Sequence, residues 1–105
     1  MLELSYNIAN NYKTAIVTIN QEIIDELVAD KFTEEVINKL EKDTKLLIID
    51  LSQVVDIKSV GLGMFINAYS YLYHKHNIPI KITDAADEVR KLFSITKIDS
   101  IIEVT

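Results

Sequence analysis

The sequence predicts an α/β domain in which a mixed, mostly parallel β-sheet with an antiparallel edge hairpin is packed against helices. Short β-branched and apolar segments alternate with amphipathic segments in the order β-β-α-β-α-β-α-β, which is typical of parallel sheets covered by helices. The first two strands follow each other directly, which adds an antiparallel pair at one edge. The chain has 105 residues, so we expect a single domain that spans residues 1–105.

The predicted edge hairpin begins at the N-terminus. Apolar residues occupy every second position from Leu2 to Ile8, which indicates a strand with one buried face. Asn10 and Asn11 favour a turn, because asparagine tolerates left-handed backbone conformations. The β-branched and apolar segment 14–19 predicts the returning strand.

An amphipathic helix and a buried strand follow the hairpin. Ala29, Phe32, Val36 and Leu40 recur at helical spacing, with charged residues between them. The short, continuous apolar run at 45–51 indicates a central strand that is buried on both faces.

The second predicted helix carries two apolar stripes. The stripe predicted to face the core consists of Leu62, Phe65, Ile66, Tyr69, Leu72 and Tyr73. Met64, Ala68 and Tyr71 form a second stripe at i, i+4 and i+7, away from that face. This second stripe has two interpretations: it packs on a neighbouring helix, or it is an exposed docking surface for a partner protein.

The C-terminal third predicts a strand, a short helix and a last strand. Pro79 ends the second helix and precedes a short strand at 80–83. Asp84 and Asp87 have the spacing of a capping box, with Asp in place of the usual Glu, before a short helix with Phe93 on its apolar face. The apolar segment 101–104 predicts the last strand.

The composition excludes several classes of protein. With 49% hydrophobic and 26% charged residues, the chain is globular rather than disordered. The lack of cysteine excludes disulfides and thiolate catalysis and fits a reducing cytoplasm, where we expect the protein. A net charge of −5 without a basic cluster argues against nucleic acid as a partner. No apolar run approaches the roughly 20 residues of a membrane span, and the N-terminus lacks a signal-peptide pattern.

Few residues suggest catalysis or metal binding. His74 and His76 lie two residues apart, on different faces of a predicted helix end, which does not favour a metal site. Asp25, Asp50 and Asp56 fall near strand-to-helix loops, where α/β sheets bind ligands, although acids in loops also serve turns and helix caps. Since no nucleophile–base pair accompanies them, we expect no enzymatic activity, no metal and no cofactor.

The two glycines of the chain, Gly61 and Gly63, lie at the start of the second helix. They lack the third glycine of a dinucleotide motif and the Gly-Lys-Ser/Thr of a P-loop. Their predicted role is structural, because glycine lets a helix pack closely under a loop. Ser59 is the predicted N-cap of a helix that begins at Val60, and a serine at that positive helix end would also accommodate a phosphate.

The region around these glycines resembles the signature of the STAS domain (sulfate transporter and anti-sigma factor antagonist). The signature has a strand that ends in D-L-S, a hydrophobic connection, and D-S-S-G-L-G at a helix start. The matching residues here are Asp50, Leu51 and Ser52, then Ile57, Ser59, Gly61, Leu62 and Gly63. The element order and the segment 89–98 are also similar to the family, so the resemblance covers nearly the whole chain and implies a STAS-like fold.

The resemblance implies a bacterial partner-switching regulator, an anti-sigma factor antagonist. In that family the domain binds an anti-sigma factor that is itself a serine kinase of the GHKL type, and binding frees a sigma factor for transcription. The kinase phosphorylates the second serine of D-S-S-G and thereby ends binding. A phosphate has this effect because it adds nearly two negative charges inside a packed interface. The oligomeric state is left open.

This chain departs from the signature at the switch. Lys58 stands where the motif has Asp, and Val60 replaces the phosphoacceptor serine, so phosphate cannot attach at that position. Ser59 matches the first serine and is either a minor modification site or a helix cap. Asp25 resembles the family's loop acid before the first helix. The predicted partner-binding residues are Asp25, Lys58, Ser59, Val60, Gly61, Leu62, Met64, Ala68 and Tyr71.

Three functions follow from these residues. The first, which we favour, is an anti-sigma factor antagonist that keeps the binding surface without the standard switch and is regulated by abundance or through Ser59. The second is a non-enzymatic STAS subunit of a larger complex, such as a lipid-transport ATPase assembly. That branch also has a hydroxyl residue followed by a small apolar residue before Gly-Leu. The third, an enzyme that uses the loop acids, has the least support.

Overall fold

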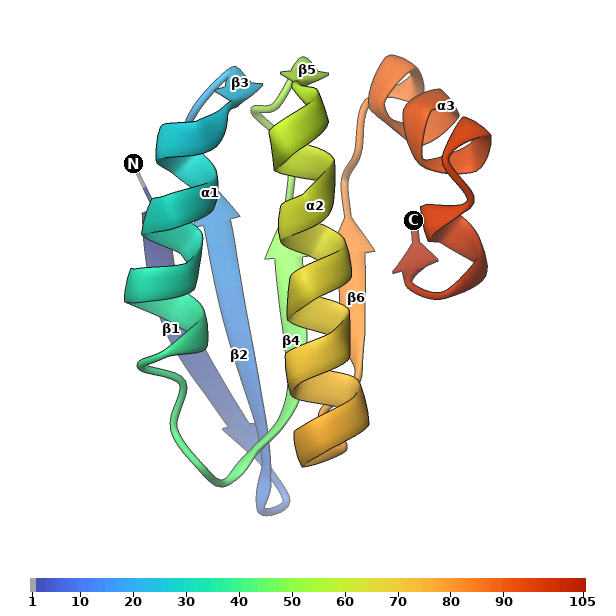
Figure 1. Cartoon of the computed structure of the whole chain (residues 1–105). Helices are drawn as coiled ribbons and strands as arrows, with labels where there is room; N and C mark the ends of the chain where they lie inside the picture. The colour runs from blue at the N-terminus through green and yellow to red at the C-terminus, as the bar shows by residue number, and fades with distance from the viewer. Residues whose placement is uncertain (1) are drawn as a thin grey trace.

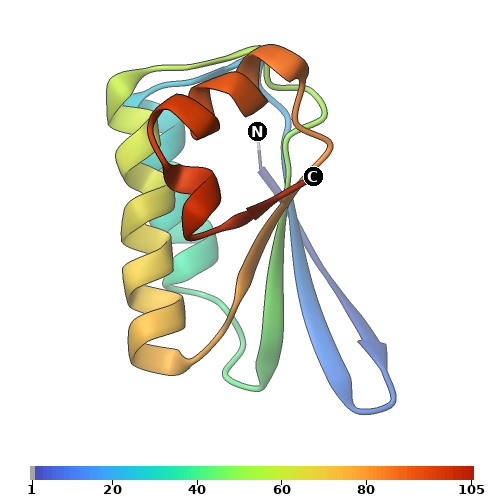
Figure 2. The same cartoon turned by 90° about the vertical axis from the view of Figure 1, so that its right-hand side faces the viewer.

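The computed structural model describes residues 2–105 and contains a five-stranded sheet with its helices on one face (Figures 1 and 2). The strands are β1 (Leu2–Ala9), β2 (Tyr12–Ile19), β4 (Thr44–Asp50), β6 (Ile80–Thr83) and β7 (Glu103–Val104), and they lie side by side in this order. β1 is antiparallel to β2, and the other neighbours are parallel. The predicted fold class and edge hairpin are confirmed.

The helices connect the parallel strands. α1 (Glu26–Phe32) continues into η1 (Thr33–Ile37), and α2 (Ser59–Ala68) continues into η2 (Tyr69–Lys75), where both continuations are wider π-helical turns. α3 (Asp87–Ile95) is followed by a 3-10 turn, η3 (Ile98–Ser100). Within residues 2–105, none of these helices is both long enough and apolar enough to cross a membrane.

The prediction that the central strand is buried on both faces is wrong. Leu47 and Ile49 face the helices and are fully buried, whereas Leu46 and Ile48 on the opposite face are less buried. The sheet grows in one direction, from β2 to β4, β6 and β7. Right-handed crossovers that all step in one direction place every helix on the same side. Figure 2 shows the resulting uncovered face of the sheet.

The edge hairpin turns as the sequence predicts. Asn10 and Asn11 have φ angles of 54° and 63°, and Ala9 pairs with Tyr12 across them. A two-residue hairpin turn with left-handed backbone at both positions matches the twist of the flanking strands. The two asparagines therefore determine the register of β1 on β2.

The start of α3 and the last strand differ from the predictions. Asp84 has a left-handed backbone (φ 58°), and the N-cap of α3 is Ala86, without a side-chain cap. The predicted capping box of Asp84 and Asp87 is wrong because the turn at Asp84 places Asp87 inside the first helical turn. The last strand contains only residues 103 and 104, while Ile102 is buried in the core.

Gly61 lies where α2 comes closest to the loop that precedes α1. A Cβ atom at this position would lie 2.7 Å from both the carbonyl oxygen and Cγ2 of Ile24, and 3.0 Å from Cγ2 of Ile57. The predicted close packing is therefore confirmed for Gly61. It does not apply to Gly63, where an added Cβ would meet nothing within 4 Å. Neither glycine has a positive φ, so Gly61 is required for space rather than for conformation.

We expect Gly61→Ala and Gly63→Ala to change stability in opposite directions. The methyl group added at position 61 collides with the Ile24 carbonyl and lowers the free energy of unfolding by about 1–3 kcal/mol. The change at position 63 removes an unhindered glycine from a helix interior and raises the free energy of unfolding by about 0.5–1 kcal/mol. Urea unfolding followed by circular dichroism measures both. A Gly61→Ala variant as stable as the native protein would contradict the close approach.

Candidate functional site

The starts of α1 and α2 are held side by side by a second, small sheet. β3 (Ile23–Ile24) pairs in parallel with β5 (Asp56–Ile57) at the carboxyl end of the main sheet (Figure 1). The N–H of Lys58 donates to the Ile24 carbonyl at 2.9 Å, and the N–H of Val55 donates to the Glu22 carbonyl at 2.7 Å. These bonds tie the two strand-to-helix loops together, so that both helix starts form one surface.

Ser59 is not the helix cap that the sequence predicts. The N-cap is Lys58, which has extended backbone, and α2 begins at Ser59 itself. The reason is that the Lys58 carbonyl accepts from the N–H groups of both Gly61 (2.8 Å) and Leu62 (3.2 Å), and it thereby becomes the first carbonyl of the helix. The hydroxyl of Ser59 does not cap α2, and the residue is exposed.

Val60 belongs to an exposed, largely apolar surface at the starts of α1 and α2, which we call the Val60 surface. Val60 itself is 49% exposed, and Lys58 and Ser59 beside it are exposed as well. The other apolar members are Ile23, Leu27 and Val55, all exposed residues of the two linked loops and the start of α1. A groove of about 410 Å³ between the β5 loop and α3 extends the surface as far as the exposed Ile95. Gathered apolar residues of this kind mark interaction sites.

Ile23, Leu27 and Val55 were not among the site residues predicted from the sequence. A signal was present, because Leu27 and Val55 lie close in sequence to the two loop acids Asp25 and Asp56, which were candidates. Apolar residues beside a predicted helix start fit neither the periodicity of a helical face nor the alternation of a strand, so neither pattern singles them out. They become meaningful only when the β3–β5 pairing brings the loops together.

The second apolar stripe of α2 is not an exposed docking surface. Met64 is 4% exposed and Ala68 2% exposed, and both belong to the core, with α1 running alongside α2 (Figure 1). Tyr71 is exposed but lies in η2, away from Val60. The alternative interpretation, packing inside the helix layer, is therefore correct for Met64 and Ala68.

The predicted core face of α2 is correct for Phe65 and Leu72, which are buried, and Leu62 and Tyr69 pack against the core. It is wrong for Ile66 and Tyr73. The buried residues Gly61, Met64, Phe65, Ala68 and Leu72 form a single stripe, whereas Ile66 is 46% exposed and Tyr73 is also exposed. Gly61 must face the β3–β5 loops, since its missing side chain leaves room for Ile24. This contact sets the rotation of the helix. Among the other predicted site residues, Leu62 is partly buried and Gly61 is buried.

The loop acids serve local structure. Asp25 caps α1, since its Oδ1 accepts from the N–H of Val28 at 3.1 Å. Asp50 accepts from the N–H of Ser52 at 2.9 Å, in a turn directly after β4. Asp56 accepts from the N–H of Ile57 at 2.9 Å and lies 3.5 Å from Nζ of Lys58. Asp25 and Asp56 are exposed at the same end as Val60, so a partner that covers this surface would meet them as well.

The candidate site offers little for metal coordination. Across residues 2–105, no three His, Cys, Asp or Glu side chains are grouped so that they could hold a metal ion. His74 and His76 pack instead against Tyr69 and Tyr71 at ring-centroid distances of 5.1 Å and 4.8 Å. The chemistry of the surface is therefore that of apolar contact bordered by single charges.

Fold and site together define an α/β domain whose candidate site is an exposed apolar surface at a helix start rather than a cluster of reactive groups. The STAS domain family model matches residues 5–105, and the chain belongs to this family. A search of curated proteins finds no match.

Solved structures show the same fold at low sequence identity. An anti-sigma factor antagonist from Mycobacterium paratuberculosis has a TM-score of 0.71 and 19% identity over 99% of this chain and 85% of that chain. The Bacillus anti-sigma factor antagonist SpoIIAA, unphosphorylated, has a TM-score of 0.74 and 10% identity, with 98% and 88% covered. An anti-sigma-factor antagonist (STAS) domain protein from Planctomyces limnophilus has a TM-score of 0.77 and 8% identity, with 97% and 87% covered.

We expect Met64→Ala and Ile66→Ala to separate the buried face of α2 from its exposed face. Removing the buried Met64 side chain leaves a cavity and lowers the free energy of unfolding by about 2–5 kcal/mol. Ile66→Ala lowers it by less than about 1 kcal/mol, because the side chain is half exposed. Chemical unfolding of both variants gives the comparison. Equal losses would contradict this rotation of α2 about its axis.

Proposed function

We propose that the protein is an anti-sigma factor antagonist-like regulator of sigma-factor-dependent transcription. It binds an anti-sigma factor, a serine kinase of the GHKL type, through the Val60 surface, and it acts by binding rather than by catalysis. Membership of the STAS family and the likeness to structures described as anti-sigma factor antagonists support this proposal. We further propose that it acts in the bacterial cytoplasm.

The observation that carries the proposal is the exposed start of α2. Lys58, Ser59 and Val60 project from a helix end that is held rigidly by the β3–β5 pairing and by the close contact of Gly61. A rigid surface loses little conformational entropy when it binds, which favours affinity. The exposed Ile23, Leu27 and Val55 around it provide apolar area that a partner would cover.

Val60 gives this regulator a different mode of control. SpoIIAA has been solved in a phosphorylated form, so that relative of the fold carries a phosphate. The position that matches the family's phosphoacceptor is valine here, and its side chain has no hydroxyl. Binding would then be controlled by the abundance of the protein, or by modification of Ser59, which is exposed beside it.

We expect Val60→Asp to weaken partner binding while Ile8→Asp does not. An unpaired carboxylate in an apolar interface is desolvated without compensation, so affinity falls at least about tenfold. Ile8 is a matched control, since it is an exposed β-branched residue in the hairpin at the other end of the molecule (Figure 1). Immobilised protein captures the partner from a lysate of its own cell, mass spectrometry identifies it, and calorimetry measures affinity with the purified partner.

Recovery of a kinase-type anti-sigma factor, with binding lost in Val60→Asp alone, supports the proposal. Recovery of a transport ATPase would favour the alternative of a STAS subunit in a lipid-transport assembly and would overturn our choice. If Val60→Asp bound the partner with the same affinity as the native protein, the Val60 surface would not be part of the interface.

We expect Val60→Ser to restore phosphorylation by the partner kinase. With ATP present, intact-mass analysis should show one phosphate on the Val60→Ser protein, and none or a trace on the native protein. The double variant Ser59→Ala/Val60→Ser controls for the neighbouring hydroxyl and should still take up one phosphate. Stoichiometric phosphate on the native protein that disappears in Ser59→Ala would refute the loss of the switch.

A further inference from the structure

A cavity of about 690 Å³ lies at the end of the molecule opposite the Val60 surface. It opens between the end of η1 with the loop that follows it, the residues 71–78 in and after η2, and the start of β4, which meet at the lower end of Figure 1. Binding sites for small organic molecules usually have volumes of roughly 300–1,000 Å³. The cavity is therefore large enough for such a ligand.

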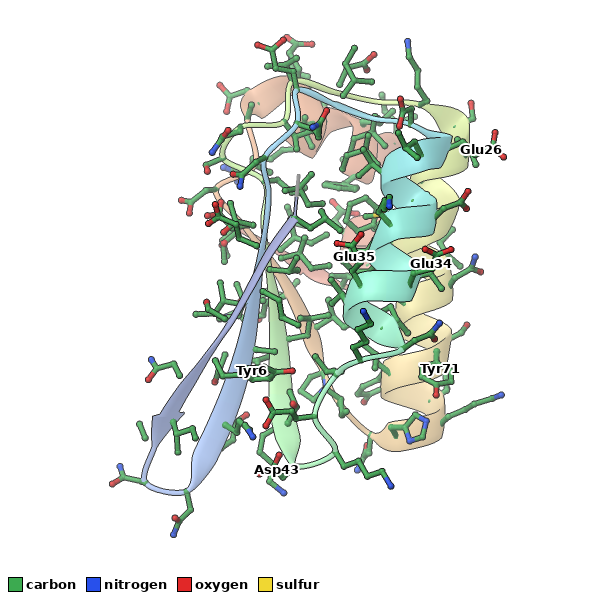
Figure 3. All side chains as sticks on the ribbon, turned by 90° about the vertical axis from the view of Figure 1, so that its left-hand side faces the viewer. Tyr6, Glu26, Glu34, Glu35, Asp43 and Tyr71 are labelled. Carbon is green, nitrogen blue, oxygen red and sulfur yellow. The ribbon has the colours of Figure 1, made fainter. Side chains whose placement is uncertain are left out.

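Apolar side chains and two rings line this cavity. The apolar part consists of Ile37, Leu40, Leu72 and Ile78. The exposed rings of Tyr71 and His76 also line it, with their centroids 4.8 Å apart. Figure 3 shows Tyr71 projecting from η2 at this end of the molecule. An apolar lining with a few polar groups is typical of sites that bind organic molecules.

One wall of the cavity is held in place by the buried Lys13. Its Nζ forms an ion pair with Glu41 and lies 3.0 Å from Oδ1 of Asp43. The hydrogen bonds with Glu41 and Asp43 raise the pKa of Lys13, and the bond from Lys13 lowers the pKa of Asp43. The N–H of Glu41 also donates to the hydroxyl of Tyr6 at 3.1 Å (Figure 3 labels Tyr6 and Asp43). This wall is therefore formed before any ligand arrives.

The charges that line the cavity favour an anion. Lys42 and Lys45 line it and form no ion pair within residues 2–105, whereas the carboxylate of Glu41 shares Lys13 with Asp43. The two helix ends contribute about half a negative charge each. Lys13 leaves one charge of its two carboxylates uncompensated, so the lysine charges exceed the negative charges once Lys75 is counted. Lys75 adds a third cation, 5.9 Å from the ring centre of Tyr71. This local excess of positive charge contrasts with the net charge of −5 of the chain.

Thr44 adds a polar group that lacks a partner. It lines the cavity, it is 3% exposed, and its Oγ1 makes no hydrogen bond within the described part of the chain. A buried hydroxyl without a partner is unfavourable, and a ligand acceptor would relieve this cost. The orphaned hydroxyl is an observation independent of the lysine charges.

We propose that this cavity binds a small amphipathic organic anion. The apolar body of the ligand packs against Ile37, Leu40, Leu72 and Ile78. Its anionic head lies near Lys42 and Lys45, beside Thr44. The site is separate from the Val60 surface, so this inference does not depend on the proposed function.

Fluorescence titration with 8-anilinonaphthalene-1-sulfonate, itself an aromatic body with an anionic group, tests the site on the folded native protein. Saturable binding at one site is expected. Octanoate should displace the probe at least about tenfold more effectively than octanol or octylammonium of equal chain length, because only octanoate pairs with the lysines.

Variants assign the site to the cavity. Lys42→Gln/Lys45→Gln should weaken probe and octanoate binding about tenfold, and Thr44→Val should weaken octanoate binding about two- to tenfold. Thr44→Val should also leave thermal unfolding unchanged or raise its midpoint, because it removes the orphaned hydroxyl at nearly constant volume. Lys91→Gln removes the same charge from α3 and should leave binding unchanged, which controls for net charge.

Changes in the amide NMR chemical shifts of the native protein on addition of octanoate test the site without any variant. Shifts are expected to concentrate at residues 37–45 and 71–78. No saturable probe binding, equal displacement by octylammonium, unchanged affinity in the double lysine variant, or shifts centred on Val60 would each overturn the proposal.

Discussion

The close approach of α2 to the β3–β5 loops is the contact on which the rest of the structure depends. A Cβ atom on Gly61 would lie 2.7 Å from the Ile24 carbonyl oxygen, which leaves no space for a side chain. The N–H of Lys58 bonds to the same carbonyl, at 2.9 Å. One backbone oxygen therefore fixes both where α2 begins and how closely it lies to the first loop. Any larger residue at position 61 would separate the two helix starts.

This contact also determines the rotation of α2, and the rotation divides its residues between core and surface. Because Gly61 faces Ile24, residues at helical spacing from it, such as Phe65, turn inward, and Phe65 meets Phe93 of α3 edge-on with ring centroids 5.2 Å apart. Val60 and Ile66 turn outward as a consequence. A valine that faces water at a helix start is unexplained by packing, which is why the surface around it carries the functional proposal.

The single helix formed by α2 and η2 reaches both ends of the domain (Figure 1). Its start presents an apolar surface with few cations, suited to a protein partner. Its end, with Lys75 and His76, lies beside a cavity where lysines outnumber free carboxylates. At the carboxyl ends of the strands the two loops are tied together by the β3–β5 pairing. At the amino ends the loop before β4 is tied to β2 by Lys13, which pairs with Glu41 and Asp43.

Local chemistry was readable from the sequence alone. The Asn10-Asn11 turn, the alternation of strands and helices, and the Gly-Leu-Gly at the start of the second helix depend on residue type and spacing, and the fold class and family follow from them. Which face of α2 is buried was decided by the tertiary structure. The two apolar stripes of α2 could each be buried, so periodicity could not choose between Met64 and Ile66. That choice required the Ile24 carbonyl, a backbone atom 37 residues from Gly61 in sequence, whose position no local pattern encodes.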